Sequence, residues 1–208
     1  MTIDRAGYPF IAGAGVLAVA AALAVGAAAA LPLAVLAAFF LYFFRDPDRT
    51  SPQDPTLVLS PADGRVLVAG PAEAAASPPG EWKQISIFLS PMDVHVNRTP
   101  IAGKVTRVDF RPGRFLPAYH RDAAATNERS EVWVEQRGVT VVFRQIVGVL
   151  ARRVVCRVSR GAELHAGQRI GVMKFGSRMD VFVPPSAELR VAVGDKVVGG
   201  ITAIAVLP

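Results

Sequence analysis

The stretch from Ala6 to Phe44 contains no Asp, Glu, Lys, Arg or His, and this feature limits the possible folds more than any other. It is much longer than the apolar region of a cleavable signal peptide, and a helix needs about 20 apolar residues to cross a bilayer. The sequence therefore predicts a membrane anchor over residues 1–44. The anchor is expected to be one long tilted span or two short helices bent near Leu31 and Pro32. A buried core helix is the alternative.

Aromatic and basic residues border this stretch. Tyr8 and Phe10 at one end, and the aromatic side chains within 39–44 at the other, resemble the belts that form at membrane interfaces. Arg45 and Arg49 follow at once. By the tendency of cytoplasmic flanks to carry basic residues, we expect the anchor to lie in the inner (cell) membrane with the folded domain facing the cytoplasm.

The excess of positive charge lies outside the anchor. Asp4 and Arg5 cancel, so the formal net charge of +6 belongs to the residues after Phe44. An anionic neighbour is expected, and the anchor favours anionic membrane lipid. No zinc-finger spacing or RNA-binding aromatic signature is present, so we expect no nucleic acid partner. Cys156 is the only cysteine, which excludes an intrachain disulfide, and we expect it to be a buried inert thiol and the chain to bind no metal.

A Pro- and Asp-rich segment, "RDPDRTSPQDP", predicts a linker over 45–56, and short β-branched runs between turn signals then fill 57–208. We expect a mostly β domain, an antiparallel sandwich or open barrel. The segment "PAYHRDAAATNERS" is expected to be a loop, either functional or a plain connector. The predicted strands are Leu57–Leu59, Arg65–Ala69, Gln84–Leu89, Gly103–Phe110, Glu131–Gln136, Val139–Val147, Val154–Val158, Arg169–Lys174, Asp180–Val183 and Lys196–Val206.

The pair Gly176 and Ser177 lies between two apolar runs in "GQRIGVMKFGSRMDVFVP". A glycine before a serine permits positive φ and lets another group approach the peptide carbonyl closely. An attack of the Ser177 hydroxyl on the Gly176 carbonyl would need both properties. An ordinary turn is the alternative.

A second group of polar residues lies in "SIFLSPMDVHVNRTP", where Asp93, His95 and Asn97 alternate and would share one face of an extended segment. His95 is a candidate acid or base, because an imidazole titrates near neutral pH, or else a structural histidine. Asp63, in "LSPADGRV", is a further candidate and otherwise a turn residue.

Five motifs in this order, "FFRDPDR", "SPADG", "LSPMDVHVNRTP", "NERSEVW" and "FGSRMDVFVP", resemble the phosphatidylserine decarboxylases, in particular their short bacterial form among the pyruvoyl-dependent decarboxylases. The resemblance implies a proenzyme that cleaves itself between Gly176 and Ser177. The products would be a β chain of residues 1–176 and an α chain of residues 177–208, held together as a heterodimer. Ser177 would become the pyruvoyl group.

The resemblance also implies roles for other residues. Asp63, His95 and Ser177 would act in maturation with the logic of a serine protease: orienter, base and nucleophile. Longer family members have two histidines spaced H-x-x-H, of which the second usually has the triad role, and His95 matches the first while Arg98 occupies the second position. Either His95 serves maturation and decarboxylation alike, or cleavage relies on another group. Arg178 stands where many members have Thr.

A loop motif that matches the family is "NER". Its residues Asn127, Glu128 and Arg129 are candidates for shaping the site.

The implied reaction converts phosphatidylserine to phosphatidylethanolamine through a Schiff base between the substrate amine and the pyruvoyl group. His95 is the candidate proton donor at the substrate α-carbon. Two other functions remain open: a lipoyl- or biotinyl-like carrier modified at Lys174, and a membrane-tethered β binding module. Against the carrier, we expect Lys174 to lie inside a strand.

Overall fold

The computed structural model describes residues 1–149 and 154–208. These residues form two compact units, Met1–Asp48 and Arg49–Pro208. The boundary between the units falls within the segment 45–56, which the sequence predicts as the linker.

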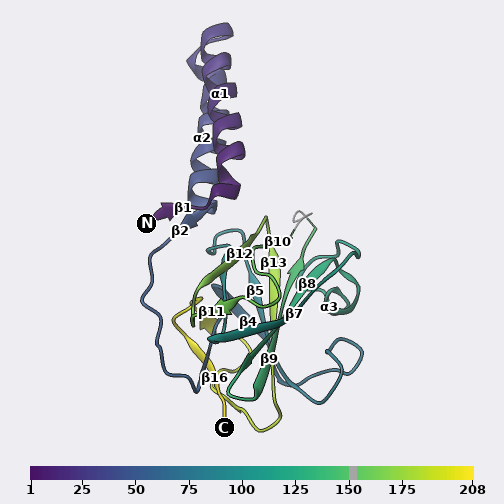
Figure 1. The fold of residues 1–208 in the computed structure, drawn as a ribbon. Coiled ribbons are helices and arrows are strands. Elements are labelled where there is room, and N and C mark those ends of the chain that lie inside the picture. Colours follow the sequence, from purple (N-terminus) through teal and green to yellow (C-terminus); the bar gives the residue numbers. More distant parts are fainter. Residues whose placement is uncertain (150–153) are drawn as a thin grey trace. The chain divides into compact units, whose positions relative to one another are not determined.

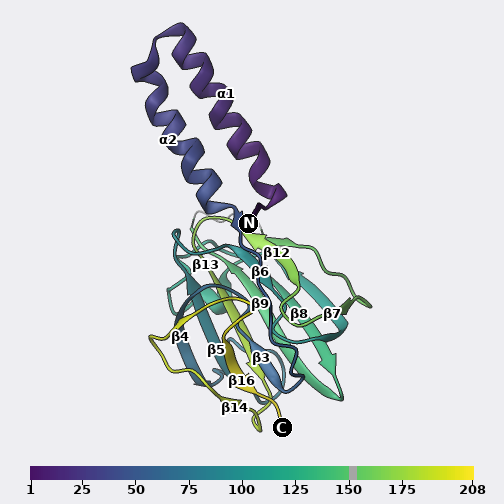
Figure 2. The same ribbon diagram turned by 90° about the vertical axis from the view of Figure 1, so that its left-hand side faces the viewer.

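The first unit is a hairpin of two antiparallel helices, closed at its base by a short β-ladder (Figures 1 and 2). Its elements are β1 (Thr2–Ile3), η1 (Arg5–Gly7), α1 (Tyr8–Ala24), α2 (Ala27–Phe43) and β2 (Arg45–Asp46). The chain reverses at Val25 and Gly26, where Gly26 has a φ of 120° that glycine adopts readily. The bend expected near Leu31 and Pro32 is therefore wrong. Pro32 lies early in α2, where its missing N–H removes one helical hydrogen bond.

Aromatic packing joins the two helices near their base. Gly7 lies against the ring of Phe44 with no room for a Cβ, and Phe10 stacks on the same ring at a centroid distance of 5.5 Å. The Met1 ammonium pairs with Asp48 at 3.1 Å. The segment Arg5–Ala24 is long and apolar enough to cross a membrane, and its side chains are mostly exposed. The hairpin thus has little interior of its own to bury these apolar side chains.

The second unit is mostly β and is built on one curled eight-stranded sheet with two three-stranded sheets beside it. All neighbouring named strands in the described residues pair antiparallel (Figure 1). The large sheet has the order β11-β7-β8-β9-β13-β5-β4-β15, and the small sheets have the orders β10-β12-β6 and β14-β16-β3. The elements are β3 (Leu57–Leu59), β4 (Gly64–Pro71), β5 (Lys83–Leu89), β6 (Val96–Arg98), β7 (Gly103–Arg111), α3 (Ala123–Thr126), β8 (Arg129–Gln136), β9 (Val139–Val147), β10 (Val154–Cys156), β11 (Glu163–Leu164), β12 (Arg169–Met173), β13 (Ser177–Val183), β14 (Glu188–Leu189), β15 (Lys196–Val197) and β16 (Ala203–Val206).

One face of the large sheet, called the inner face below, covers the hydrophobic core. Phe143 of β9 and Met179 and Val181 of β13 belong to this core and are fully buried. The other face, called the outer face below, carries the alternate residues of the same strands. It is unusually polar for a face with so many buried side chains, and it includes Arg144 and Asp180.

The mostly β fold class is confirmed, and several expected boundaries are corrected. The strand expected at Asp180 begins at Ser177, and the strand expected over Lys196–Val206 is two strands separated by a turn. The predicted strand Arg169–Lys174 ends at Met173. The expected loop "PAYHRDAAATNERS" contains α3 and the start of β8. These segments are short, so tertiary pairing outweighs their local preference.

The hairpin predicts the topology of the anchor. In a membrane, both of its ends would lie on one side, whereas a single span would separate them. In a Cys156→Ser background, we expect cysteines at positions 2 and 53 to react with a membrane-impermeant maleimide from the same side of sealed vesicles. A cysteine at Val25, in the apolar tip, should stay unlabelled from both sides. Labelling of position 2 only from the side opposite to position 53 would contradict the hairpin.

Candidate active site

Ser177 is the first residue of β13 and lies in the middle of the large sheet. It pairs with Leu89 of β5 on one side and with Val147 of β9 on the other. Its side chain alternates with Arg178 and so faces inward with Met179, and it is fully buried. The Ser177 Oγ has no hydrogen-bond partner among the described residues. Buried hydroxyls without partners are rare in native proteins, so this one marks a candidate reactive site.

The turn that leads into Ser177 is strained. Phe175 and Gly176 have φ angles of 58° and 73°, both in the left-handed region. A residue other than glycine adopts this conformation at a cost of about 1–2 kcal/mol. The carbonyl oxygen of Gly176 lies against the backbone of Gly148, where no Cβ would fit. Gly148 therefore belongs to the site, although nothing in its sequence context distinguishes it.

The "NER" segment holds the backbone beside Ser177. The Asn127 amide donates to the carbonyl oxygens of Val147 and Leu116, both at 2.8 Å, and accepts from the Leu116 N–H at 3.0 Å. The carbonyl of Glu128 accepts from the Val147 N–H at 3.1 Å. Asn127 is fully buried, so its amide joins the loop around Leu116 to the strand that pairs with Ser177. The Arg129 side chain instead lies on the outer face.

His95 directly precedes β6 and lies beside the end of β12, the strand that leads to this turn. Its carbonyl accepts from the Met173 N–H at 3.2 Å, and its ring is fully buried. The His95 Nδ1 lies 3.0 Å from the carbonyl oxygen of Asp93. If Nδ1 donates this bond, Nε2 carries the lone pair that a base needs. The structure thus brings His95 close to the segment that precedes Ser177.

Asp93 does not share the face of His95 as expected. Its carboxylate accepts from the Ser90 N–H at 2.8 Å and closes a turn. The extended segment begins only at Val96.

A chain of buried hydrogen bonds ends at Asn97. The Ser130 hydroxyl donates to Gln145 Oε1 at 2.8 Å, and Gln145 Nε2 donates to Asn97 Oδ1 at 2.8 Å. Asn97 Nδ2 has no hydrogen-bond partner among the described residues. Gln145 lies two residues from Val147 on the inner face, about 7 Å along the strand from the position opposite Ser177. The chain therefore runs from the inner face of the sheet that carries Ser177 to a buried amide donor, the kind of group that stabilises a negative oxygen.

The hydrogen-bond partners of Asp63 are not His95 and Ser177, the other members of the expected triad. Arg49 donates to both of its carboxylate oxygens, at 2.6 and 2.8 Å, and the Gly199 N–H donates to it at 2.8 Å. These are all of its hydrogen bonds with described residues, so the structure does not join it directly to His95 or Ser177.

A cavity of about 680 Å³ opens beside Asp63. It includes Phe88 and Ser90, which flank Leu89, the strand partner of Ser177. This volume lies within the usual range for small-molecule sites. Neither Ser177 nor His95 lines the cavity. Its lining residues are Asp63, Gly64, Arg65, Phe88, Ser90, Met92, Asp93, Lys196, Val197 and Val198.

The remaining candidate positions have structural surroundings. Arg98 follows His95 by three residues and so faces the other way, where it donates to the Gly167 carbonyl at 3.1 Å. Arg178 is buried and donates to Asp180 at 2.6 Å. Lys174 lies in the turn after β12, so the expectation that it lies inside the strand is wrong.

Cys156 lies in β10 and is partly buried. Burial raises the pKa of its thiol, so the thiol stays protonated near neutral pH and is a poor nucleophile. Within residues 1–149 and 154–208, no group of three or more His, Cys, Asp or Glu side chains could hold a metal ion.

Comparison with known proteins gives a consistent result. The family model described as phosphatidylserine decarboxylase matches residues 36–205. A protein of Geotalea uraniireducens named phosphatidylserine decarboxylase proenzyme is 42% identical over 207 residues, covering 99% of this chain and 97% of the relative. One of the same name from Magnetococcus marinus is 40% identical over 202 residues, covering 96% and 93%.

Proposed function

The chain belongs to the phosphatidylserine decarboxylase family, and we propose that it converts phosphatidylserine to phosphatidylethanolamine with a pyruvoyl group made from its own Ser177. The observation that carries this proposal is the similarity to decarboxylase proenzymes over almost the whole chain. The carrier and binding-module alternatives have no comparable support. The position of Lys174 in a turn does not by itself argue against a carrier.

Self-cleavage would begin at the strained turn. The Ser177 Oγ attacks the Gly176 carbonyl carbon, the peptide C–N bond breaks, and the nitrogen takes a proton, which leaves an ester. Loss of the Ser177 α-proton then breaks the Cβ–O bond and releases the Gly176 carboxylate. The resulting dehydroalanine isomerises to an imine, and water replaces its nitrogen and releases ammonia. No oxidant or external cofactor is needed.

Three features of the uncleaved chain support this step. The positive φ of Phe175 stores strain one residue before the pair Gly176–Ser177. The close packing of the Gly176 carbonyl on Gly148 limits its movement, which favours a defined direction of attack. Asn97 Nδ2 is a buried donor suited to the negative oxygen that forms on the carbonyl.

His95 and Asp63 complete the proposed site. We assign His95 Nε2 as the base in maturation and as the proton donor to the substrate α-carbon in decarboxylation. The pyruvoyl group supplies a ketone that condenses with the substrate amine and accepts the electron pair left by the departing carboxylate. We assign Asp63 to maturation from its motif, and its bonds to Arg49 and Gly199 hold it at the neighbouring cavity.

Strand pairing would keep the two products together as a heterodimer. The small chain, 177–208, contains β13, which lies between β5 and β9 of the large chain. Its β15 pairs with β4, and its β16 pairs with β3. Separation would require all of these ladders to break.

Membrane association is supported by the apolar helix near the N-terminus. We propose that the hairpin anchors the chain in the cell membrane with the enzyme domain in the cytoplasm, where the net charge of +6 faces anionic lipid. The labelling experiment above, performed on inverted and right-side-out vesicles, decides the orientation.

The first prediction concerns the cleavage itself. The purified chain should run as two bands, whereas Ser177→Ala should run as one band of 22.1 kDa because it lacks the nucleophile. Mass spectrometry should show a small chain that is lighter than the unmodified 177–208 peptide by one ammonia and lacks a terminal amine. An intact Ser177-containing chain that still converts phosphatidylserine would overturn the proposal.

The same gel tests the role of Asp63. The Asp63→Asn protein should remain mostly uncleaved, and normal cleavage of this variant would show that Asp63 has no role in maturation.

The second prediction concerns Asn97. Asn97→Leu keeps the size of the side chain but removes the donor, so cleavage should slow by about 10²–10³-fold. The half-time of band conversion measures this effect. Ser130→Ala, at the far end of the same hydrogen-bond chain, should slow cleavage by less than tenfold. Equal slowing by both variants would indicate a packing role instead.

The third prediction concerns turnover after cleavage. In His95→Gln, carbon dioxide release per cleaved chain should fall by about 10²–10⁴-fold because the proton donor is missing. His120→Gln is the control and should match the parent, because the His120 side chain is half exposed on a loop. Parental turnover by cleaved His95→Gln protein would exclude His95 as the proton donor.

A further inference from the structure

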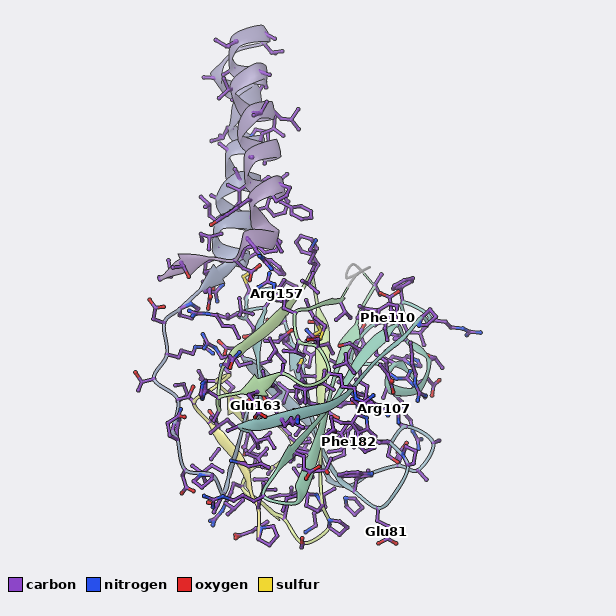
Figure 3. The ribbon with its side chains drawn as sticks, viewed as in Figure 1. Glu81, Arg107, Phe110, Arg157, Glu163 and Phe182 are labelled. Atoms are coloured by element: carbon purple, nitrogen blue, oxygen red, sulfur yellow. The ribbon has the colours of Figure 1, made fainter. Side chains whose placement is uncertain are left out.

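The outer face of the large sheet carries a lattice of charged residues that the proposed reaction does not use. Cross-strand pairing places Arg111, Arg129, Ile146 and Arg178 in one row, which is the row next to Ser177. The adjacent row contains Asp109, Glu131, Arg144 and Asp180. A third row runs from Arg107 to Phe182, both labelled in Figure 3.

Each carboxylate in this lattice already has an arginine partner. Glu131 pairs with Arg144 at 2.5 Å. Asp109 pairs with Arg107 at 2.5 Å, and Asp180 pairs with Arg178 at 2.6 Å. Among the residues of these rows on β7, β8, β9 and β13, Arg111 and Arg129 are therefore the cations that make no ion pair with a described residue.

Arg129 is the more unusual of the two. It is only 9% exposed, and its Nε has no hydrogen-bond partner among the described residues. Its Nη1 donates to the carbonyls of Ala125 and Asn127, at 2.9 and 3.3 Å, and neither acceptor carries a charge. Burial, together with the nearby charges of Arg144 and Arg111, lowers the pKa of Arg129. The nearby acids Glu131 and Asp180 act in the opposite direction, but each is already paired with another arginine, so the buried charge of Arg129 has no counter-charge of its own among the described residues.

A cavity of about 370 Å³ lies where this charge is concentrated. Arg111, Arg129 and Arg144 form one side, and the loop 74–80 forms the other. The loop sequence "AAASPPG" has small side chains that leave the space open, and the Ala76 carbonyl holds Arg144 in place. Glu81, next to this loop, is exposed and labelled in Figure 3. The loop residues that line the cavity include no acidic side chain.

We propose that this cavity binds a phosphate group, carried by an anionic lipid headgroup or free in solution. Guanidinium groups bind phosphate oxygens through paired, charge-assisted hydrogen bonds, and the neighbouring guanidinium groups of Arg111 and Arg129 suit a group with several negative oxygens. The site lies on the face of the sheet opposite to the Ser177 side chain. It is thus a second site, separate from the proposed reaction, and it does not depend on cleavage.

The test uses the full chain carrying Ser177→Ala, purified in a neutral detergent, so that binding is measured without processing or turnover. Calorimetric titration with inorganic phosphate, at constant ionic strength, forms one arm. Titration with short-chain phosphatidylglycerol, against phosphatidylcholine of the same chain length, forms the other. Arg111→Gln and Arg129→Gln should each weaken binding about tenfold or more in the arm that shows binding, since each removes charged hydrogen bonds.

Controls separate a specific site from general attraction to positive charge. Arg190→Gln removes the same charge at an exposed position paired with Glu188, and it should leave affinity within about twofold. Arg111 is exposed, so Arg111→Gln tests the site even if Arg129→Gln fails to fold. Binding in the phosphate arm alone identifies a soluble phosphate ligand, and binding in the phosphatidylglycerol arm identifies a lipid headgroup. No binding in either arm, or equal losses in Arg111→Gln and Arg190→Gln, overturns the proposal.

Discussion

The central position of β13 is the constraint on which the rest of the site depends. This strand is hydrogen-bonded on both sides, to β5 and to β9, from its first residue. The bond between Gly176 and Ser177 therefore joins a strained turn to one of the most firmly held strands of the sheet. Strain can be concentrated at this bond because one side of it cannot move. A terminus created there would stay in place, since the ladders that hold it do not involve the residues before it.

Buried polar groups are arranged differently on the two sides of this strand. In the interior below the inner face, Ser177 and Asn97 each keep a buried polar atom that has no hydrogen-bond partner among the described residues. On the outer face, the acids of β7, β8 and β13 each pair with an arginine, within a strand or across strands, and Arg111 and Arg129 make no such pair with a described residue. Unpaired buried groups destabilise a fold, so their retention indicates a use. The inner set suits chemistry on the chain and its substrate, and the outer set suits the binding of an anion.

Strands with a clear β-branched or apolar pattern in the sequence were predicted well, whereas several short strands without such a pattern were not. The predicted bounds of Leu57–Leu59 and Val139–Val147 are those of β3 and β9. The three-residue β6 and the two-residue β14 carry too few residues for a periodic pattern, and they exist because partner strands lie alongside. The strand was expected to begin only at Asp180, since Gly-Ser is common in turns, yet pairing on both sides extends it back to Ser177. The reversal at Gly26 was missed because Pro32 is the stronger breaker signal.

By itself the sequence determined the apolar N-terminal segment, the β class of the domain, and the motifs that identify the family. These follow from composition, periodicity and local residue order, which are properties of the chain before it folds. Only the tertiary structure decided that Gly148 lies against the Gly176 carbonyl, that Asn97 is oriented through Gln145, and that Asp63 is engaged by Arg49. It also decided that Arg111 and Arg129 lie side by side. These contacts join residues far apart in sequence, and strand register, which fixes which side chains meet, depends on the whole sheet.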